Sequence, residues 1–358
     1  MRANKGERSE FYAFLKILEE KRLPAADKNL EIITDKFFIF KKIIRDEPGR
    51  GVKTFDLQGA DIVILDSEGD IIKTVSDGHI KENLITIFEK IQDAVDTTFE
   101  IPEAESLMQD LLCSQIKANS SKKSDIDGVI IDRVSNREEL LGFSVKSMVG
   151  GASTLLNAGQ TTNFVYEVEE LNVDVVDEIN GIDGPSKIQD RLKMIITKGG
   201  NLKFTGMISP EFETNLRKID TMFPIFLSQM LIDFFMGKFN KITDLTELLA
   251  NNSILQDFRL SKEDYEYKIK NFLVSIALGM VPSKVWDGFT KAHGGYIVVK
   301  YDGEVVCYHL YNRDEFLAYL FENTKLESAS STRHNYGKLY VQDGKLYINL
   351  NLQIRFIK

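Results

Sequence analysis

Cysteine and proline are scarce in this sequence, and long apolar runs are missing. Its 358 residues include only two cysteines, Cys113 and Cys307, which stand far apart and outside any CxxC pair. This excludes a disulfide scaffold and a cysteine-built zinc site, and it is typical of a protein of the reducing cytoplasm. The richest apolar stretches, 222–236 and 272–281, are shorter than the roughly 18 unbroken apolar residues of a membrane-spanning helix. We therefore expect no membrane partner, and the polar first ten residues predict no secretory signal.

An excess of positive charge is also missing, since 45 basic side chains face 54 acidic ones and the net charge is -9. Bulk charge therefore does not indicate a nucleic-acid-binding protein. The distribution along the chain is uneven. Residues 167–183 contain seven acids and no base, which predicts a solvated loop, whereas residues 325–358 contain six bases and two acids. The C-terminal segment is thus the part best suited to an anionic surface.

The length predicts about two domains at roughly 150 residues each. Mixed helical and strand patterns come first, mostly helical patterns follow, and mostly strand patterns end the chain. We expect a first domain over 1–170 and a second over 171–358, in a mixed α/β (α+β) fold. The main expected elements are a helix over 7–20, a strand pair over 124–132 and 140–147, a long helix over 211–236 kinked at Pro224, and hairpins over 60–75, 296–310 and 338–356.

The predicted strand pair bears unusual polar residues. Side chains alternate along a strand, so Ser144 and Lys146 share one face, and the partner strand places Asp125 beside them. A carboxylate that holds Mg²⁺ and a lysine that orients or deprotonates water are the groups needed for metal-assisted phosphodiester hydrolysis. The pattern resembles the PD-(D/E)XK nuclease signature with Ser144 in the acidic position. A surface strand with a solvated aspartate and lysine is the alternative interpretation.

A second candidate feature opens the chain. The Lys5-Gly6-x-x-x-Glu10 motif resembles the entry into the first helix of resolvase-type nucleases, in which a glutamate reaches the metal site. Glu10 is the candidate for that role, and Glu7 is the second choice because it lies on the helix face continued by Phe11. The alternative is that both acids merely favour the positive end of the helix dipole.

The segment after Lys146 is dense in glycine and in hydrogen-bonding residues. Glycines allow the backbone to approach a ligand closely, and small polar side chains are the types that contact phosphate and sugar. An ordinary loop is the alternative. The candidate DNA-binding residues of this segment are Ser147, Ser153, Asn157, Gln160 and Asn163.

Four separated motifs resemble, in the same order, those of the HpaII family of type II restriction endonucleases. They are NKGERSE at 4–10, KSDI at 123–126, GFSVKS at 142–147 with STLLNAG at 153–159, and TRHNYGKLY at 332–340 with LNLQIRF at 350–356. The resemblance implies a PD-(D/E)XK-like sheet core flanked by helices and Mg²⁺-dependent cleavage of double-stranded DNA at CCGG. It also implies a prokaryotic cytoplasm and a separately encoded cytosine methyltransferase. Arg8 departs from the family, where we expect an aromatic residue, and should change packing under the helix.

The resemblance also assigns roles to individual residues. Asp125 matches the family's acidic position and is the expected metal ligand, while Lys146 matches the catalytic lysine. Ser144 occupies a position that most relatives fill with an acid, so Glu10 is the candidate for the missing charge. Asp127 lies on the same strand face as Asp125 and is a possible second ligand, although it matches no motif position. A palindromic site favours a homodimer but does not require one.

Recognition of a G·C-only site requires donors to guanine and acceptors for cytosine in the major groove. Residues 349–355 alternate polar and apolar side chains, which predicts either a DNA-facing ribbon or an ordinary half-buried strand; the basic C-terminal segment favours the ribbon. The candidate base-reading residues are Arg333, His334, Asn335, Asn349, Asn351, Gln353 and Arg355.

Two other functions remain open from the residues alone. A Ser-Lys hydrolase would use Ser144 as nucleophile and Lys146 as base, but side chains two apart on a flat strand point in parallel with their functional atoms apart. A non-catalytic DNA-binding protein would keep the fold without turnover. Metal dependence separates the nuclease from the first alternative, and Lys146→Ala separates it from the second.

Overall fold

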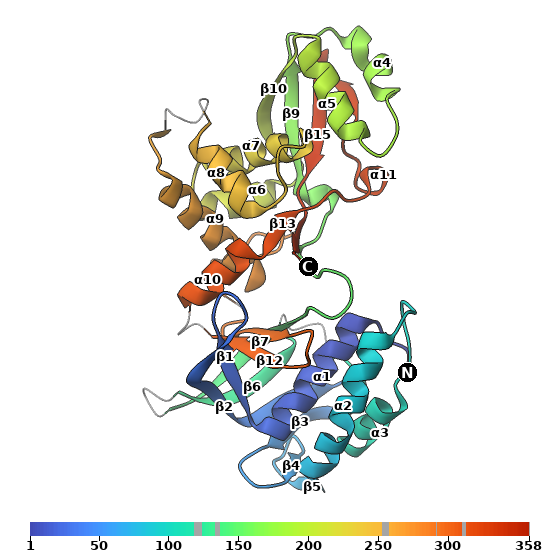
Figure 1. Ribbon diagram of the computed structural model, residues 1–358, viewed down its shortest axis with the longest axis vertical. Coiled ribbons are helices and arrows are strands. Elements are labelled where there is room, and N and C mark those ends of the chain that lie inside the picture. The colour runs from blue at the N-terminus through green and yellow to red at the C-terminus, as the bar shows by residue number, and fades with distance from the viewer. Residues whose placement is uncertain (118–123, 133–136, 253–257, 291, 310–312, 358) are drawn as a thin grey trace.

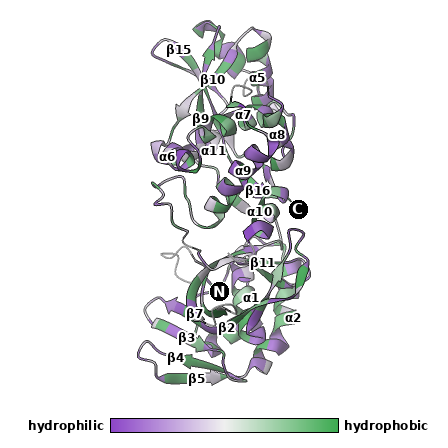
Figure 2. Ribbon diagram, turned by 90° about the vertical axis from the view of Figure 1, so that its left-hand side faces the viewer, coloured by the Kyte–Doolittle hydropathy of each residue, from purple (hydrophilic) through white to green (hydrophobic). Residues whose placement is uncertain are grey.

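The computed structural model describes residues 1–117, 124–132, 137–252, 258–290, 292–309 and 313–357. Lys123 of the KSDI motif and residues 133–136, between the two expected strands, lie outside these ranges. Figures 1 and 2 show two lobes along the long axis, with the C-terminus between them. Helices and strands alternate in both lobes, which confirms the mixed α/β class.

A nine-stranded sheet forms the frame of the lower lobe in Figure 1. Its order is β1-β12-β11-β7-β6-β2-β3-β4-β5, and β1 also pairs with β2. Six strands therefore close into a barrel-like ring, from which β3, β4 and β5 extend. The strands are β1 (Arg22–Ala26), β2 (Ile32–Glu47), β3 (Gly51–Asp56), β4 (Ile62–Leu65), β5 (Ile71–Val75), β6 (Ile126–Asp132), β7 (Arg137–Ser147), β11 (Gly295–Val299) and β12 (Val305–Tyr308).

Three helices, α1 (Lys5–Glu20), α2 (Asp77–Asp93) and α3 (Pro102–Asp110), lie together against this sheet (Figure 1). The helix expected over 7–20 is amphipathic, and its apolar face, including Phe11, Phe14 and Leu18, is buried in the lobe's core. Burial of this face fixes the orientation of α1 about its axis. The polar side chain of Glu10 is thereby held at the edge of the core.

The upper lobe contains two smaller sheets and most of the helices (Figure 1). One sheet has the order β10-β9-β15-β14 and the other β13-β16-β8. The strands are β8 (Thr154–Leu156), β9 (Asn163–Glu169), β10 (Asn201–Met207), β13 (Thr324–Leu326), β14 (Leu339–Gln342), β15 (Lys345–Asn351) and β16 (Ile354–Phe356). The α-helices are α4 (Val176–Asn180), α5 (Lys187–Thr197), α6 (Pro210–Ile219), α7 (Phe223–Phe235), α8 (Ile242–Ala250), α9 (Lys262–Ala277), α10 (Arg313–Glu322) and α11 (Ser331–His334).

Strand β7 is an interior strand of the large sheet. It pairs antiparallel with β6 on one side and parallel with β11 on the other. Strands β11 and β12 come from residues 295–308, so the late part of the chain returns to complete the sheet that holds the predicted strand pair. A strand paired on both sides has little freedom to shift, which makes β7 a rigid support for polar side chains.

The prediction of one long helix over 211–236 is wrong, because α6 ends at Ile219 and α7 begins at Phe223. The Asp220 side chain accepts a hydrogen bond from the Met222 amide, a local turn that competes with helix formation. Pro224 then stands in the first turn of α7, where its missing N–H costs nothing. Proline here begins a second helix instead of kinking one.

Two further expectations need correction. The acidic stretch is not loop throughout, because β9 includes Glu167 and Glu169, and Glu167 pairs with Lys345 on the neighbouring strand. Residues 349–355 are not one strand, because β15 ends at Asn351 and β16 belongs to a different sheet. No helix within the described ranges has the length and apolar character to cross a membrane.

Candidate active site

A capping box fixes the start of α1. The Asn4 side chain accepts from the Glu7 amide at 3.0 Å, and the Glu7 carboxylate accepts from the Asn4 amide at 2.9 Å. Both groups satisfy backbone donors that a helix N-terminus otherwise leaves unpaired. Glu7 is therefore used by the helix itself, which leaves Glu10, nearly one turn further on, as the glutamate available to the site.

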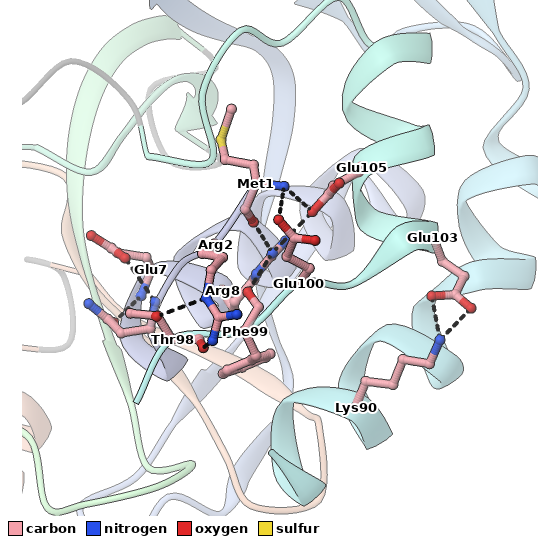
Figure 3. Close-up of polar contacts among 11 residues, drawn as sticks. Met1, Arg2, Glu7, Arg8, Lys90, Thr98, Phe99, Glu100, Glu103 and Glu105 are labelled. Atoms are coloured by element: carbon pink, nitrogen blue, oxygen red, sulfur yellow. Dashed lines mark hydrogen bonds and ion pairs between the residues drawn. The ribbon is translucent and has the colours of Figure 1, made fainter. Parts of the chain in front are cut away.

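Arg8 anchors the same helix through polar contacts, which Figure 3 shows. Its side chain is buried and donates to the carbonyls of Met1 and Phe99, the latter at 2.9 Å, and it lies 3.4 Å from the Glu105 carboxylate. Arg8 thus ties α1 to the segment before α3. Its contacts lie away from the β6–β7 pair, so it acts through packing and polar anchoring of the helix.

Asp125 is held rigidly between β6 and β7. Its amide donates to the Phe143 carbonyl at 2.8 Å, which continues the β6–β7 ladder by one residue. Its carboxylate Oδ2 accepts from the Val145 amide at 2.8 Å and from the Ser144 hydroxyl at 3.2 Å. These bonds occupy Oδ2 and leave Oδ1 turned to the other side, where it lies 3.9 Å from Lys117 Nζ.

Glu10 meets Asp125 across the contact between α1 and β7. The Glu10 Oε1 atom lies 3.4 Å from Lys117 Nζ, and Oε2 is buried with no hydrogen-bond partner among the described residues. Burial raises the pKa of Glu10 to about 7, and the negative charge of Asp125 adds to the rise, while Lys117 and Lys146 oppose it. Two carboxylates therefore share one partly buried site, where a cation would be favoured.

Lys117 is a further residue of the site, and no motif of the sequence predicts it. Burial lowers its pKa, but the nearby carboxylates of Glu10 and Asp125 outweigh burial, and the pKa is raised overall. The sequence offers a weak signal in retrospect, a lysine eight residues before the motif aspartate. Only the fold brings that lysine between two acids.

Lys146 and Glu10 line one open cavity of about 740 Å³. The cavity is bordered by the start of α1, the end of α2 and the segment after β7. Its other lining residues include Lys5, Ser147, Gly150, Gly151 and Ser153. The predicted lysine, the predicted glutamate and part of the glycine-rich segment thus line the same open space.

The structure does not bring Asp127 into this group. Its carboxylate accepts a hydrogen bond from the Ser124 hydroxyl, and it faces Gly142 on the partner strand. Within the described ranges, no group of three or more His, Cys, Asp or Glu side chains is placed to hold a metal ion by itself. Two carboxylates, one with an unpartnered buried oxygen, nevertheless fit a hard cation that takes its remaining oxygens from water and phosphate.

Comparison with known proteins shows the family of the chain. The HpaII restriction endonuclease family model matches residues 4–356. The chain is 35% identical over 356 residues to the type II restriction enzyme HpaII of Haemophilus parainfluenzae. These residues cover 99% of this chain and 98% of that protein. The chain belongs to the HpaII restriction endonuclease family. It is a type II restriction endonuclease, and no solved structure matches it.

The glycine-rich segment of this restriction endonuclease is held by the C-terminal strands. Asn351 is buried and donates to the Gly159 carbonyl at 2.7 Å and to the Asn163 side chain at 2.6 Å. Asn163 is also buried and donates to the carbonyls of His334 and Asn335. The half-buried-strand interpretation therefore applies to Asn351, and Asn163 joins the segment to α11.

Arg355 of β16 also holds the glycine-rich segment. Its guanidinium donates to the Ala152 carbonyl, at 3.1 Å from Nε, and pairs with Glu327 at 2.5 Å. Strand β16 also pairs with β8 inside the glycine-rich segment. In this structure Arg355 thus supports the backbone that follows Lys146.

Other predicted DNA-binding residues of the endonuclease lie at the surface. Arg333 and Asn335 are exposed on and just after α11, and Asn157 and Gln160 are exposed in the glycine-rich segment. His334 and Gln353 are half-buried. Ser147 accepts from the Val149 amide at 3.0 Å while it lines the cavity. The exposed residues have side chains available for a partner, and the buried ones position the backbone.

Proposed function

We propose that this endonuclease hydrolyses duplex DNA at CCGG in a Mg²⁺-dependent reaction at the cavity lined by Glu10 and Lys146. The observation that carries the proposal is the convergence of Glu10 from α1, Asp125 before β6 and Lys146 on β7. The CCGG specificity rests on the family resemblance of the four sequence motifs.

The arrangement supports a core of the PD-(D/E)XK type. An antiparallel strand pair carries the aspartate and the lysine, and a helix from the start of the chain supplies a glutamate beside them. In the same proposal, residues 1–170 form most of the nuclease part and residues 171–358 most of the recognition part. The exceptions are β11 and β12, which complete the nuclease sheet, and β8 and β9, which belong to the sheets of the other lobe.

Asp125 and Glu10 would hold the Mg²⁺ ion. When bound, the ion polarises the scissile phosphate and offsets the charge that develops on it. Ser144 and the Val145 amide orient Asp125, so that only Oδ1 turns toward the shared site. Ser144 is thus a positioning residue. It stands in the acidic position of the nuclease signature, but its hydroxyl does not replace the carboxylate expected there.

Lys146 supplies the positive side chain on the reaction side of the sheet. Its position on an interior strand, paired with Val298 of β11, keeps its backbone fixed while its ammonium extends into the cavity. There it orients the attacking water and offsets charge on the phosphate in the transition state. The exposed residues Arg333, Asn335, Asn157 and Gln160 are the proposed contacts to bases and backbone.

The proposed partners follow from the reaction. A nuclease with a four-base site would cut its own genome, so we propose a separately encoded cytosine methyltransferase in a prokaryotic cytoplasm. The palindromic site favours a homodimer that presents one active site to each strand.

The test is a plasmid digestion with Mg²⁺ or EDTA, followed by sequencing of the fragment ends. We expect discrete Mg²⁺-dependent ends within CCGG from the wild type and from Lys42→Ala, a control on neighbouring β2 whose lysine lies 3.8 Å from Asp56. Lys146→Ala should give no ends. Discrete ends at another sequence would overturn the specificity, cleavage in EDTA would overturn the metal, and specific binding without cleavage would favour the non-catalytic alternative.

A further inference from the structure

Lys117 lies against two acids of the proposed active site although no sequence motif includes it. Its Nζ atom lies 3.4 Å from Glu10 Oε1 and 3.9 Å from Asp125 Oδ1. One oxygen of each carboxylate therefore faces the same ammonium. The second oxygen of Asp125 is already bound by Ser144 and Val145. Oδ1 is thus the oxygen of Asp125 that is available to a metal ion, and it faces Lys117, as does Glu10 Oε1.

The backbone that leads to Lys117 is fixed by buried polar groups. Arg45 on β2 forms a buried ion pair with Glu47 and donates to the carbonyls of Gln115 and Ile116. Glu47 in turn accepts from the amide and the hydroxyl of Ser114. Satisfied buried networks of this kind hold one conformation. The segment 114–116 is therefore anchored to the sheet, and the place of Lys117 follows from the fold.

The Lys117 side chain itself keeps freedom to move. It is 42% exposed, whereas Glu10 and Asp125 are 20% and 17% exposed. A lysine has a flexible four-carbon stem and a compact charge that is readily solvated. The ammonium can thus leave the carboxylates by rotating toward solvent or toward a DNA phosphate, while the carboxylates stay in place.

We propose that Lys117 is a built-in counterion that competes with the divalent metal for Glu10 and Asp125. It is a positioning residue that keeps the two acids together in the free enzyme and lowers metal affinity until DNA arrives. A phosphate in the cavity attracts the ammonium and supplies oxygens to the metal, so both changes favour metal entry. The inference rests on the proposed function, because it needs Glu10 and Asp125 as the metal ligands.

The test measures metal binding without DNA and without turnover. The full-length protein is titrated with Mn²⁺, and its melting temperature is followed from EDTA to saturating metal. Lys117→Met keeps the length of the side chain and removes its charge, and we expect half-maximal stabilisation at about tenfold lower Mn²⁺. Lys117→Arg should stay close to the wild type. Lys73→Met is the matched control, since Lys73 is 35% exposed and lies 3.0 Å from Asp110 outside the site.

A second variant separates the two hypotheses. Asp125→Asn should lose the Mn²⁺ response, and an unchanged response would overturn the metal site of the proposed function. If Asp125→Asn loses the response while Lys117→Met responds as the wild type does, only the role of Lys117 is overturned. The same melting temperature for Lys117→Met and the wild type at every Mn²⁺ concentration also overturns that role.

Discussion

The Ser144 hydroxyl donates to Oδ2 of Asp125 across the β6–β7 pair, at 3.2 Å. The bond joins a residue in the acidic position of the nuclease pattern to the aspartate of the same pattern. The Val145 amide contacts the same oxygen at 2.8 Å, so Asp125 has two donors on one side and none from these residues on the other. The other oxygen, Oδ1, lies on the Lys117 side, 3.9 Å from Lys117 Nζ.

Replacing Ser144 by alanine should reduce cleavage by no more than about tenfold. The lost hydrogen bond contributes about 0.5–1.5 kcal/mol, and the Val145 amide still holds Asp125. Initial rates on a plasmid with a single site give the effect. Complete loss of activity, together with cleavage in EDTA by the wild type, would instead support the Ser-Lys hydrolase, in which Ser144 is the nucleophile.

Replacing Lys146 by alanine should lower the rate of cleavage by about 10²- to 10⁴-fold, the range typical for loss of a group that activates or orients water. Binding to a CCGG duplex should stay within about tenfold, because Lys146 makes no base contact in the proposal. Single-turnover cleavage and a gel-shift titration in Ca²⁺ measure the two effects separately. An equal loss of binding and cleavage would show that Lys146 holds the structure of the site.

Metal binding should strengthen as the pH rises from about 6 to 8. The pKa of Glu10 is raised to about 7, mainly by burial and then by Asp125, so its carboxyl group holds a proton below this value. A metal ion needs the deprotonated form. The midpoint of Mn²⁺ binding, measured at several pH values, should therefore shift in the wild type. The shift should be much smaller in Glu10→Gln, and an equal shift would exclude Glu10 as its cause.

The stability of the folded protein without metal should change with pH in the opposite direction, because a rise in pH deprotonates the buried carboxyl group of Glu10. A carboxyl group with a pKa of about 4.5 when unfolded and about 7 when folded stabilises the folded state fully below pH 4.5. That contribution, about 3 kcal/mol at 1.36 kcal/mol per pKa unit, is lost as the pH rises to about 7. Urea unfolding in EDTA should show Glu10→Gln gaining stability over the wild type between pH 5 and 8. A constant difference would contradict the raised pKa.

Arg333 and Arg355 should behave differently when each is replaced by alanine. Arg333 is exposed, so its loss should weaken binding to CCGG by about 1–3 kcal/mol and reduce discrimination against single-base variants. Arg355 is bound to Ala152 and Glu327, so its loss should lower the melting temperature and weaken binding to all sequences alike. Competition gel shifts and thermal unfolding distinguish the two. Unchanged discrimination in Arg333→Ala would remove it from the base-reading residues.

Local patterns in the sequence determined the parts of the site that lie within single elements. The helix predicted over 7–20 carries Glu10, and alternation along β7 places Ser144 and Lys146 on one face. These features depend on neighbours a few residues away. The amphipathic pattern of α1 likewise needs only an apolar core on one side.

Only the tertiary structure decided which side chains meet and which are already bound. Lys117 lies between Glu10 and Asp125 because β2 anchors the segment before it, and no local pattern reports that contact. The alternation at 349–355 predicts a polar face equally well whether it faces solvent or protein. Asn351 turns inward because the Gly159 carbonyl, the Thr162 hydroxyl and the Asn163 side chain lie within hydrogen-bond distance of its amide nitrogen, and a buried amide is stable only with such partners.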